Sequence, residues 1–138
     1  MSDKPIQITE LDLKRLRKLL EEAQHGEYRG SPYLEKLQSE LDRARVVPSE
    51  EVSQDVVTMN STVVLKDLAT GEEETYTLVF PERANIAVGR ISVLAPIGTA
   101  MLGYEVGDIF EWEVPAGKRK LKVKKIVYQP EAAGDYHL

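Results

Sequence analysis

The sequence predicts an α+β protein in which a short antiparallel helical hairpin precedes an antiparallel β-sheet that carries one short helix. Two leucine stripes with helical spacing occupy the first third of the chain, and strand-like segments bounded by turn residues follow them. The segment VVPSEEVSQ between the two halves has neither period. We therefore expect a hairpin over residues 1–47, a linker over 48–54 and a second domain over 55–138.

The first helix is predicted to begin after Thr9, whose hydroxyl can accept a hydrogen bond from a backbone N–H at the helix start. Asp12 stands three residues later, where an acidic side chain can complete a capping box. One apolar stripe then follows the helix, formed by Leu13, Leu16, Leu20 and Ala23. The glycine-bounded segment HGEYRG ends it.

The second helix is predicted from Ser31, a capping residue, and Pro32, which suits the first helical position. Its stripe consists of Leu34, Leu37, Leu41 and Ala44. Two equal stripes joined by a short loop predict an antiparallel hairpin, with ~15 residues or roughly 22 Å in each helix. Leucine periodicity by itself indicates burial, so a plain helical core is the simpler alternative to a functional coiled coil.

The second half is predicted to form two antiparallel hairpins. The segments STVVLKDL and ETYTLVF flank a turn near Gly71, and IFEWEV and RKLKVKKIVY flank the turn PAGK. In the second hairpin we expect Val114 to pair with Arg119. This register sets Trp112 beside Leu121 and Phe110 beside Val123 on the buried face, and Glu113 beside Lys120 and Glu111 beside Lys122 on the other.

The basic run KRKLKVKK therefore reads as a solvated strand face with acidic partners, and phosphate binding is the lesser alternative. The formal net charge of −5 also disfavours a sequence-independent nucleic-acid binder, whose affinity comes from neutralising phosphates. No apolar run approaches the roughly 20 residues of a membrane span, and no secretory leader is recognisable. Together with the absence of cysteine, this predicts a cytoplasmic protein without membrane contact.

The segment ISVLAPIGTAMLG, residues 91–103, predicts a strand that runs into a short and poorly capped helix. Pro96 suits the first helical position and Gly103 the position after the helix end. However, Ala95 has no side-chain oxygen for the first backbone N–H groups, and Gly98 lowers helix propensity. Either this turn is packed closely inside the domain, or its small residues face a partner protein.

Candidate catalytic residues are few. His25 and His137 stand in no metal-site or triad pattern, and GTAMLG lacks the lysine of a phosphate loop. Glu21, Glu22 and Glu27 are the carboxylates that could act together near the helical loop. We expect no catalytic residue, no metal site and no cofactor.

The segment SVLAPIGTAMLGYEVGD, with TYTLVFPERAN before it and IFEWEVPAGKRKLKVKKIVY after it, resembles the carboxy-terminal domain of the bacterial Gre transcript-cleavage factors. The positions that fit the Gre signature are Ser92, Pro96, Ile97, Gly98, Ala100, Met101, Leu102 and the Gly107-Asp108 turn. Ala95 stands where the Gre pattern has a second serine. The segments DVVTMNS and YQPEAAGDYHL resemble more closely a family of Gre relatives, the regulators of nucleoside diphosphate kinase (Rnk). The resemblance covers essentially the whole chain and implies an FKBP-like second domain.

The resemblance also implies a transcription regulator that binds RNA polymerase. In Gre factors this domain docks at the rim of the secondary channel, and a long coiled coil carries an acidic pair to the catalytic metal. Here the predicted helices are much shorter, and EEAQHGEYRG lacks an aspartate and a glutamate three residues apart. We therefore expect competition with Gre factors without stimulated transcript cleavage, and contact with DNA solely within the polymerase complex.

The expected polymerase-facing residues are Ser92, Leu94, Ala95, Pro96, Ile97 and Gly98. Two alternatives stay open. One is a true cleavage factor that acts through Glu21, Glu22 or Glu27, and the other is a self-associating structural module that uses the leucine hairpin.

Overall fold

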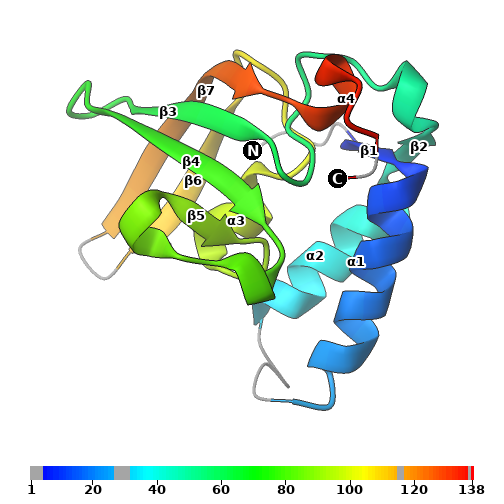
Figure 1. Ribbon diagram of the computed structural model, residues 1–138. Helices are drawn as coiled ribbons and strands as arrows, with labels where there is room; N and C mark the ends of the chain where they lie inside the picture. The colour runs from blue at the N-terminus through cyan, green and yellow to red at the C-terminus, as the bar shows by residue number, and fades with distance from the viewer. Residues whose placement is uncertain (1–4, 27–31, 115–116, 137) are drawn as a thin grey trace.

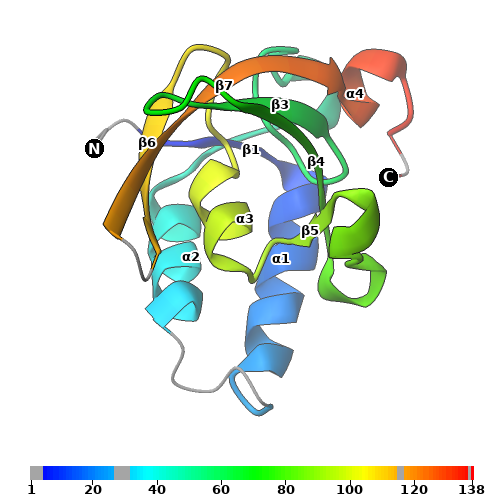
Figure 2. The same ribbon diagram turned by 90° about the vertical axis from the view of Figure 1, so that its left-hand side faces the viewer.

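The computed structural model describes residues 5–26, 32–114, 117–136 and 138 (Figure 1). A five-stranded sheet forms one side of the molecule, and two longer helices lie side by side on the other (Figures 1 and 2). A short helix lies between the sheet and the helix pair, and a last helical turn follows the sheet. These helices are α1 (Glu10–Ala23), α2 (Pro32–Arg43), α3 (Pro96–Met101) and α4 (Pro130–Ala133).

Helix α1 begins as the sequence predicts, because Thr9 Oγ1 accepts a hydrogen bond of 3.0 Å from the Asp12 backbone N–H. Helix α2 begins at Pro32, as expected, while the proposed cap Ser31 lies outside the described residues. Both predicted stripes are confirmed as buried surfaces. Their buried members are Leu16, Leu20 and Ala23 of α1 and Leu34, Leu37 and Leu41 of α2, and Leu13 and Ala44 are half-buried.

The two helices run in opposite directions. Arg17 pairs with Asp42 at 2.8 Å, whereas Gln24, further along α1, donates to Gln38, which is earlier in α2. Two short strands flank the pair, β1 (Gln7–Thr9) and β2 (Arg45–Val47), and they join in parallel. The sequence reading assigned no strand to these segments.

The strand order of the main sheet is β5-β4-β3-β7-β6. Its strands are β3 (Thr62–Asp67), β4 (Glu73–Val79), β5 (Arg90–Ser92), β6 (Ile109–Val114) and β7 (Gly117–Tyr128). The β3–β4 hairpin with its turn at Gly71, where φ is 78°, is confirmed. The expectation of a wholly antiparallel sheet is wrong, because β5 pairs in parallel with β4. Residues 80–89 connect these two strands through two 3₁₀ turns, η2 (Pro81–Arg83) and η3 (Ile86–Val88). This connection brings the chain back along β4 to Thr77, so that β5 runs in the same direction as β4.

The predicted register of the β6–β7 hairpin is wrong by two residues. Val114 pairs with Gly117 rather than with Arg119, so two residues separate the paired ends of the strands. The observed pairs include Phe110 with Leu121, Glu111 with Lys120, Trp112 with Arg119 and Glu113 with Lys118. Because side chains alternate with a period of two, this shift leaves Phe110, Leu121 and Glu111 on the faces that were expected for them. Phe110, Leu121 and Val123 are accordingly buried.

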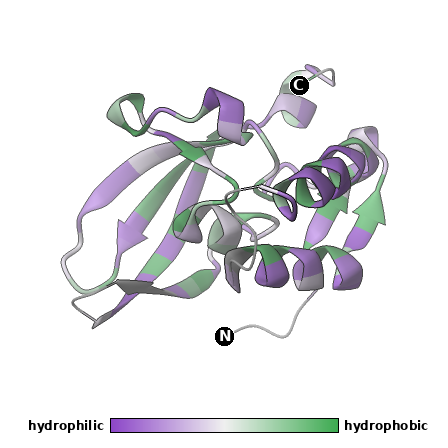
Figure 3. Ribbon diagram, turned by 90° about the horizontal axis from the view of Figure 1, so that it is seen from below, coloured by the Kyte–Doolittle hydropathy of each residue, from purple (hydrophilic) through white to green (hydrophobic). Residues whose placement is uncertain are grey.

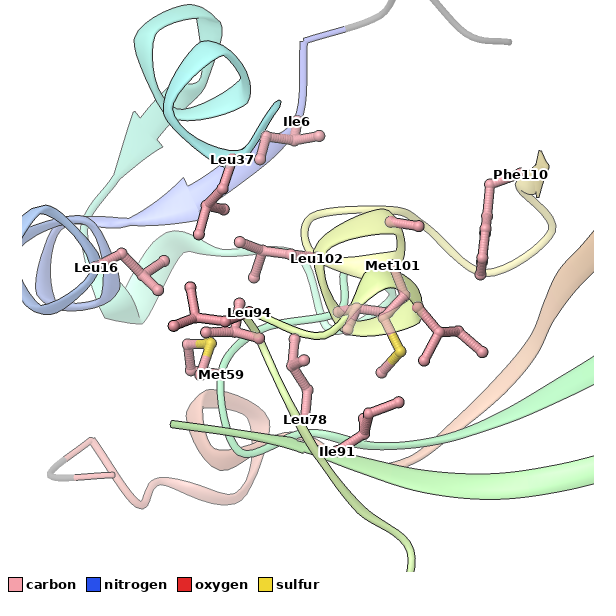
Figure 4. Packing of buried hydrophobic residues seen from close by; sticks show 14 of the residues in the cluster. Ile6, Leu16, Leu37, Met59, Leu78, Ile91, Leu94, Met101, Leu102 and Phe110 are labelled. Atoms are coloured by element: carbon pink, nitrogen blue, oxygen red, sulfur yellow. The ribbon is translucent and has the colours of Figure 1, made fainter. Parts of the chain in front are cut away.

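One apolar core joins the helix pair to the sheet. Leu16 and Leu37 have no exposed surface, and both point toward Leu94 and Leu102 at the ends of α3 (Figure 4). The hydropathy colouring shows the polar residues of α1 and α2 on the sides that face away from this core (Figure 3). The division into two domains with a linker over 48–54 stays a prediction.

The chain beyond α3 closes on the first strand. Gly103 has a φ of 79°, as suits the position after a helix end, and a Cβ at this residue would lie 2.4 Å from the Cβ of Ile6. Ile6 is itself 3% exposed and part of the core. The segment that precedes α1 is therefore seated directly on backbone from the second half of the chain.

A buried polar network connects α1 with the loop before β3 and with α4. Asp12 has no exposed surface, and its Oδ2 accepts a hydrogen bond of 3.0 Å from the Met59 backbone N–H. Thr58 Oγ1 donates to Glu131 Oε1 at 2.7 Å and contacts Ser61 Oγ at the same distance. Asp12 was expected to complete a capping box, but the fold directs its carboxylate to another segment.

Burial raises the pKa of Asp12 to about 7. The hydrogen bond from Met59 opposes this shift, and the neighbouring charge of Glu131 adds to it. In the unfolded chain Asp12 loses its proton near the ordinary pKa of 3.8. The folded protein keeps that proton up to about pH 7, so between these two pH values only the folded state binds it.

We expect the free energy of unfolding to fall by on the order of 2–3 kcal/mol between about pH 5 and about pH 8, because the folded state alone still binds the Asp12 proton over most of that range. Urea denaturation at several pH values measures this slope. Asp12→Asn keeps an acceptor for the Met59 N–H and should flatten the slope and raise stability near pH 8. The exposed Asp55→Asn is the matched control, and an Asp12→Asn protein with an unchanged slope would contradict the assignment.

Candidate functional site

The predicted polymerase-facing segment is held rigidly by its own hydrogen bonds. Ser92, the last residue of β5, accepts a bond from the Leu94 N–H through Oγ at 3.0 Å and one from the Ala95 N–H through its carbonyl. Thr99 Oγ1 donates to the Val93 carbonyl at 2.6 Å. These bonds fix the strand-to-helix turn, although Ala95 supplies no side-chain cap to α3.

The six candidate residues of this segment divide into two groups. Leu94 and Ile97 are each 4% exposed and belong to the core, and Gly98 is also buried. Ser92, Ala95 and Pro96 are half-buried and form the accessible part. A partner could therefore touch the second group, while the first group holds that surface in place.

Close packing accounts for Gly98. A Cβ at this position would lie 2.1 Å from the Ser92 carbonyl oxygen, far inside van der Waals contact. A glycine is therefore required where α3 crosses the end of β5. Close packing therefore explains the glycine in the weak helix start, whereas Ala95, which packs against the core, and Pro96 both stay half-buried and partly accessible.

The Gly107-Asp108 turn is anchored to the sheet. Asp108 Oδ2 accepts a hydrogen bond of 2.9 Å from the Glu105 N–H, and the Asp108 carbonyl accepts one from the Val123 N–H. Gly107 has a φ of 96°, a conformation that favours glycine. Gly107 and Asp108 therefore stabilise the turn and its attachment to β7, a structural role that their spacing in the sequence did not indicate.

Of the acidic residues expected at the helical tip, the structure describes two, and their side chains do not converge. Glu21 and Glu22 are exposed on the last turn of α1 and, as neighbours in a helix, point in directions about 100° apart. Glu27 lies outside the described residues. Within the described ranges, no group of three or more metal-ligating side chains is assembled, and no helix is long and apolar enough to cross a membrane.

The structure also gathers side chains that no sequence motif connects. Arg15 and Lys18 of α1 line one cleft with Phe80 and Arg83, which come from the segment after β4. The sequence gives little indication of this cleft, because its residues come from two distant parts of the chain and form no motif with a fixed spacing.

A protein-family model described as "Transcription elongation factor, GreA/GreB, C-term" matches residues 52–128. The chain belongs to the GreA/GreB family. A second model, described as "Rnk N-terminus", matches residues 4–47, the part that holds α1 and α2. The GreA/GreB match includes the segment from Ser92 to Gly98 and the Gly107-Asp108 turn.

Individual relatives confirm the resemblance read from the sequence. "Regulator of nucleoside diphosphate kinase" from Escherichia coli (strain K12) is 45% identical over 139 residues and covers 100% of both chains. "Transcription elongation factor GreA" from Pelobacter propionicus is 38% identical over 96 residues, which are 70% of this chain and 61% of that protein. These relatives place the chain among transcription elongation factor-related regulators.

A solved structure agrees with both. The "prokaryotic transcription elongation factor GreA/GreB from Nitrosomonas europaea" has a TM-score of 0.77 and 38% identity, and the match covers 91% of this chain and 100% of that one. The α+β arrangement with a mixed sheet is therefore the GreA/GreB arrangement.

Gly98→Ala should lower the free energy of unfolding by at least about 2 kcal/mol, because the added methyl group overlaps the Ser92 carbonyl and forces α3 away from β5. Gly26→Ala is the matched control, since a Cβ there meets nothing closer than 4.0 Å. Urea denaturation of both variants measures the difference. Equal stabilities would show that α3 and β5 can separate at no cost.

Proposed function

We propose that this protein is a non-enzymatic regulator that binds RNA polymerase near the secondary channel and competes there with Gre factors without stimulating transcript cleavage. The observation that carries the proposal is the GreA/GreB match over residues 52–128, joined to a helix pair of limited length. The family relationship supports RNA polymerase as the partner. The short length of α1 and α2 supports the absence of stimulated cleavage.

The accessible side of the α3 turn is the proposed contact surface. Ser92, Ala95 and Pro96 present small or rigid side chains there, so a partner backbone can approach closely without displacing a long side chain. Leu94 and Ile97 anchor this surface in the core, which keeps it preorganised for binding. The alanine in place of a second Gre serine removes one hydroxyl from the contact.

The helix pair is too short to serve as the Gre cleavage device. With 14 residues in α1 and 12 in α2, the longer helix spans about 21 Å. Stimulated cleavage requires carboxylates that hold a cation and orient a water at the polymerase metal. The exposed Glu21 and Glu22 diverge, so they offer no such pair.

Self-association through the leucine stripes has less support. Leu16 and Leu37 have no exposed surface in the single chain, and Leu20, Leu34 and Leu41 are at most 4% exposed. A second copy would find no apolar stripe to cover unless the helices first left the core.

A pull-down of core RNA polymerase on the immobilised full chain tests the proposal. Polymerase should be retained, and an added Gre factor should displace it in proportion to its concentration. Retention of polymerase and Gre factor together on the immobilised chain would exclude competition, and failure to retain polymerase at all would exclude the proposal.

Pro96→Glu should weaken polymerase binding by about tenfold or more, which corresponds to about 1.4 kcal/mol, because it places a charged side chain in the centre of the proposed contact. Glutamate is tolerated in the first turn of a helix, so the fold should persist, and circular dichroism checks this. Ala69→Glu adds the same charge at the exposed β3–β4 turn and is the matched control. A folded Pro96→Glu protein that binds as tightly as the control would move the contact elsewhere.

The protein at saturating concentration should leave the cleavage rate of backtracked transcription complexes at its intrinsic value, and it should inhibit cleavage by an added Gre factor. The physical reason is the short reach of α1 and the missing acidic pair. Gel analysis of labelled transcripts measures both rates. Stimulated cleavage that disappears when Glu21, Glu22 and Glu27 are changed to glutamine would establish the alternative, a true cleavage factor.

A further inference from the structure

The face of the main sheet that points away from the helices carries a group of lysine side chains. Helices α1, α2 and α3 all lie on one side of this sheet, so its other face is open (Figure 2). Lys66 of β3 lies directly opposite Lys122 of β7, and a register shift brings both Lys124 and Lys125 to the exposed surface. These four residues are called the lysine patch. Their neighbours in the two strands are buried on the core side, namely Leu65, Leu121 and Val123.

The observed register removes the acidic partner that the sequence predicted for Lys122. That prediction set Glu111 beside Lys122, whereas in the structure Glu111 lies opposite Lys120, and Lys122 lies opposite Ile109. On its other side Lys122 faces Lys66, a second cation. Like charges directly opposite each other in an antiparallel pair destabilise the sheet. The interpretation of the basic run as a strand face with acidic partners therefore fails at the centre of the lysine patch.

The lysine patch has an excess of positive charge. Lys124 pairs with Glu73 of β4, and this hydrogen bond, together with the charges of Lys66 and Lys125, holds the pKa of Glu73 below its usual range. One carboxylate is thus shared by several lysines. Among the described residues, Lys66, Lys122 and Lys125 form no ion pair. Asp55 lines a hollow that Lys125 also lines, so four ammonium groups stand against two carboxylates.

Basic residues are concentrated on two strands although this half of the chain is acidic. After residue 47 the sequence holds 9 lysines and arginines and 14 aspartates and glutamates. Seven of these nine basic residues belong to β3 or β7. At about 0.1 M salt, charges more than ~10 Å apart are largely screened. Local attraction is therefore determined by the lysine patch rather than by the net charge of −5.

The arrangement of the lysine patch fits a phosphate backbone better than a protein surface. Residues on one face of a strand repeat about every 6.7 Å, and neighbouring strands lie about 4.8 Å apart. A nucleic-acid backbone carries one charge per roughly 3.4 Å of each strand, so it can contact several of these lysines at once. Lysine is depleted in protein–protein interfaces, whose centres are apolar, whereas lysines gathered on one face are typical of nucleic-acid-binding surfaces.

We propose that the lysine patch binds the phosphate backbone of nucleic acid without regard to base sequence. Lys66, Lys122 and Lys125 contact the phosphates, and the bound anion relieves the repulsion between Lys66 and Lys122. With so few contacts the isolated chain binds weakly at physiological salt, so the patch acts where another interaction holds the protein near nucleic acid. The proposed polymerase contact at the α3 turn is separate, because α3 lies on the opposite side of the sheet (Figure 2).

Fluorescence anisotropy of a labelled, mixed-sequence DNA duplex with the full chain at low salt tests the proposal. Binding should be saturable, and the logarithm of the association constant should fall with the logarithm of salt concentration with a slope of about −3, as expected for three or four phosphate contacts. Polyglutamate tests an acidic protein as the ligand. Absence of saturable binding would overturn the proposal, and so would polyglutamate that competes as well as unlabelled duplex at equal concentration of negative charge.

Two charge-matched double variants test the location of the site. Lys122→Gln with Lys125→Gln should weaken duplex binding by about tenfold or more at low salt and should reduce the magnitude of the salt slope by about 2. Lys14→Gln with Lys18→Gln removes the same charge from exposed positions of α1 and should weaken binding by less than about threefold. Circular dichroism checks that both variants are folded. Equal losses in the two variants, or no loss in the first, would overturn the proposal.

Discussion

The burial of two leucine stripes against the sheet side of the molecule is the constraint on which the other features depend. Helices of 14 and 12 residues are marginal in isolation, so α1 and α2 require an apolar surface beside their mutual contact. The ends of α3 provide it through Leu94 and Leu102. Because α3 is covered by the helix pair on one side and by the sheet on the other, it must approach β5 closely. This close approach leaves no room for a Cβ beside the Ser92 carbonyl, which explains the glycine at position 98.

Polar groups buried at the edge of this core define how its parts align. Apolar packing alone tolerates small shifts of one helix along another, whereas a hydrogen bond to a buried carboxylate does not. Asp12 connects the first turn of α1 to the loop before β3, and Thr58 connects that loop to Glu131 in α4. The left-handed backbone of Asn60 belongs to the same loop. The alignment of α1 with the sheet, and with it the cleft between them, thus depends on residues distant in sequence.

The parts of the fold that follow local rules could be predicted from the sequence. The cap at Thr9, the start of α2 at Pro32 and the start of α3 at Pro96 depend on neighbouring residues, and all three are found. The β6–β7 register failed because two turns of different length fit the same alternation of side chains. Strands β1 and β2 have three residues each, too few for a periodic signal. The strand predicted before Pro96 is found as β5, but its parallel pairing with β4 is set by the tertiary fold.

The candidate site divides in the same way. The sequence located the α3 turn and its accessible Pro96, because a family signature marks them. It could not separate the buried Gly98, which packs against the Ser92 carbonyl, from the half-buried Ala95, since both are small residues in one short segment. Nor could it show that Asp12 is buried, because its position in the first turn of a helix gives a sufficient local reason for an acidic residue.

The contact between Ile6 and Gly103 has a consequence for synthesis on the ribosome. The helices can form within microseconds of leaving the exit tunnel, but the surface that covers them includes Leu102, and Ile6 cannot be seated until Gly103 has emerged. At translation rates of roughly 5–20 residues per second, that interval is on the order of seconds. During it the leucine stripes of the nascent chain lack the cover that Leu94 and Leu102 provide, so their uncovered part is accessible to chaperones that bind apolar segments.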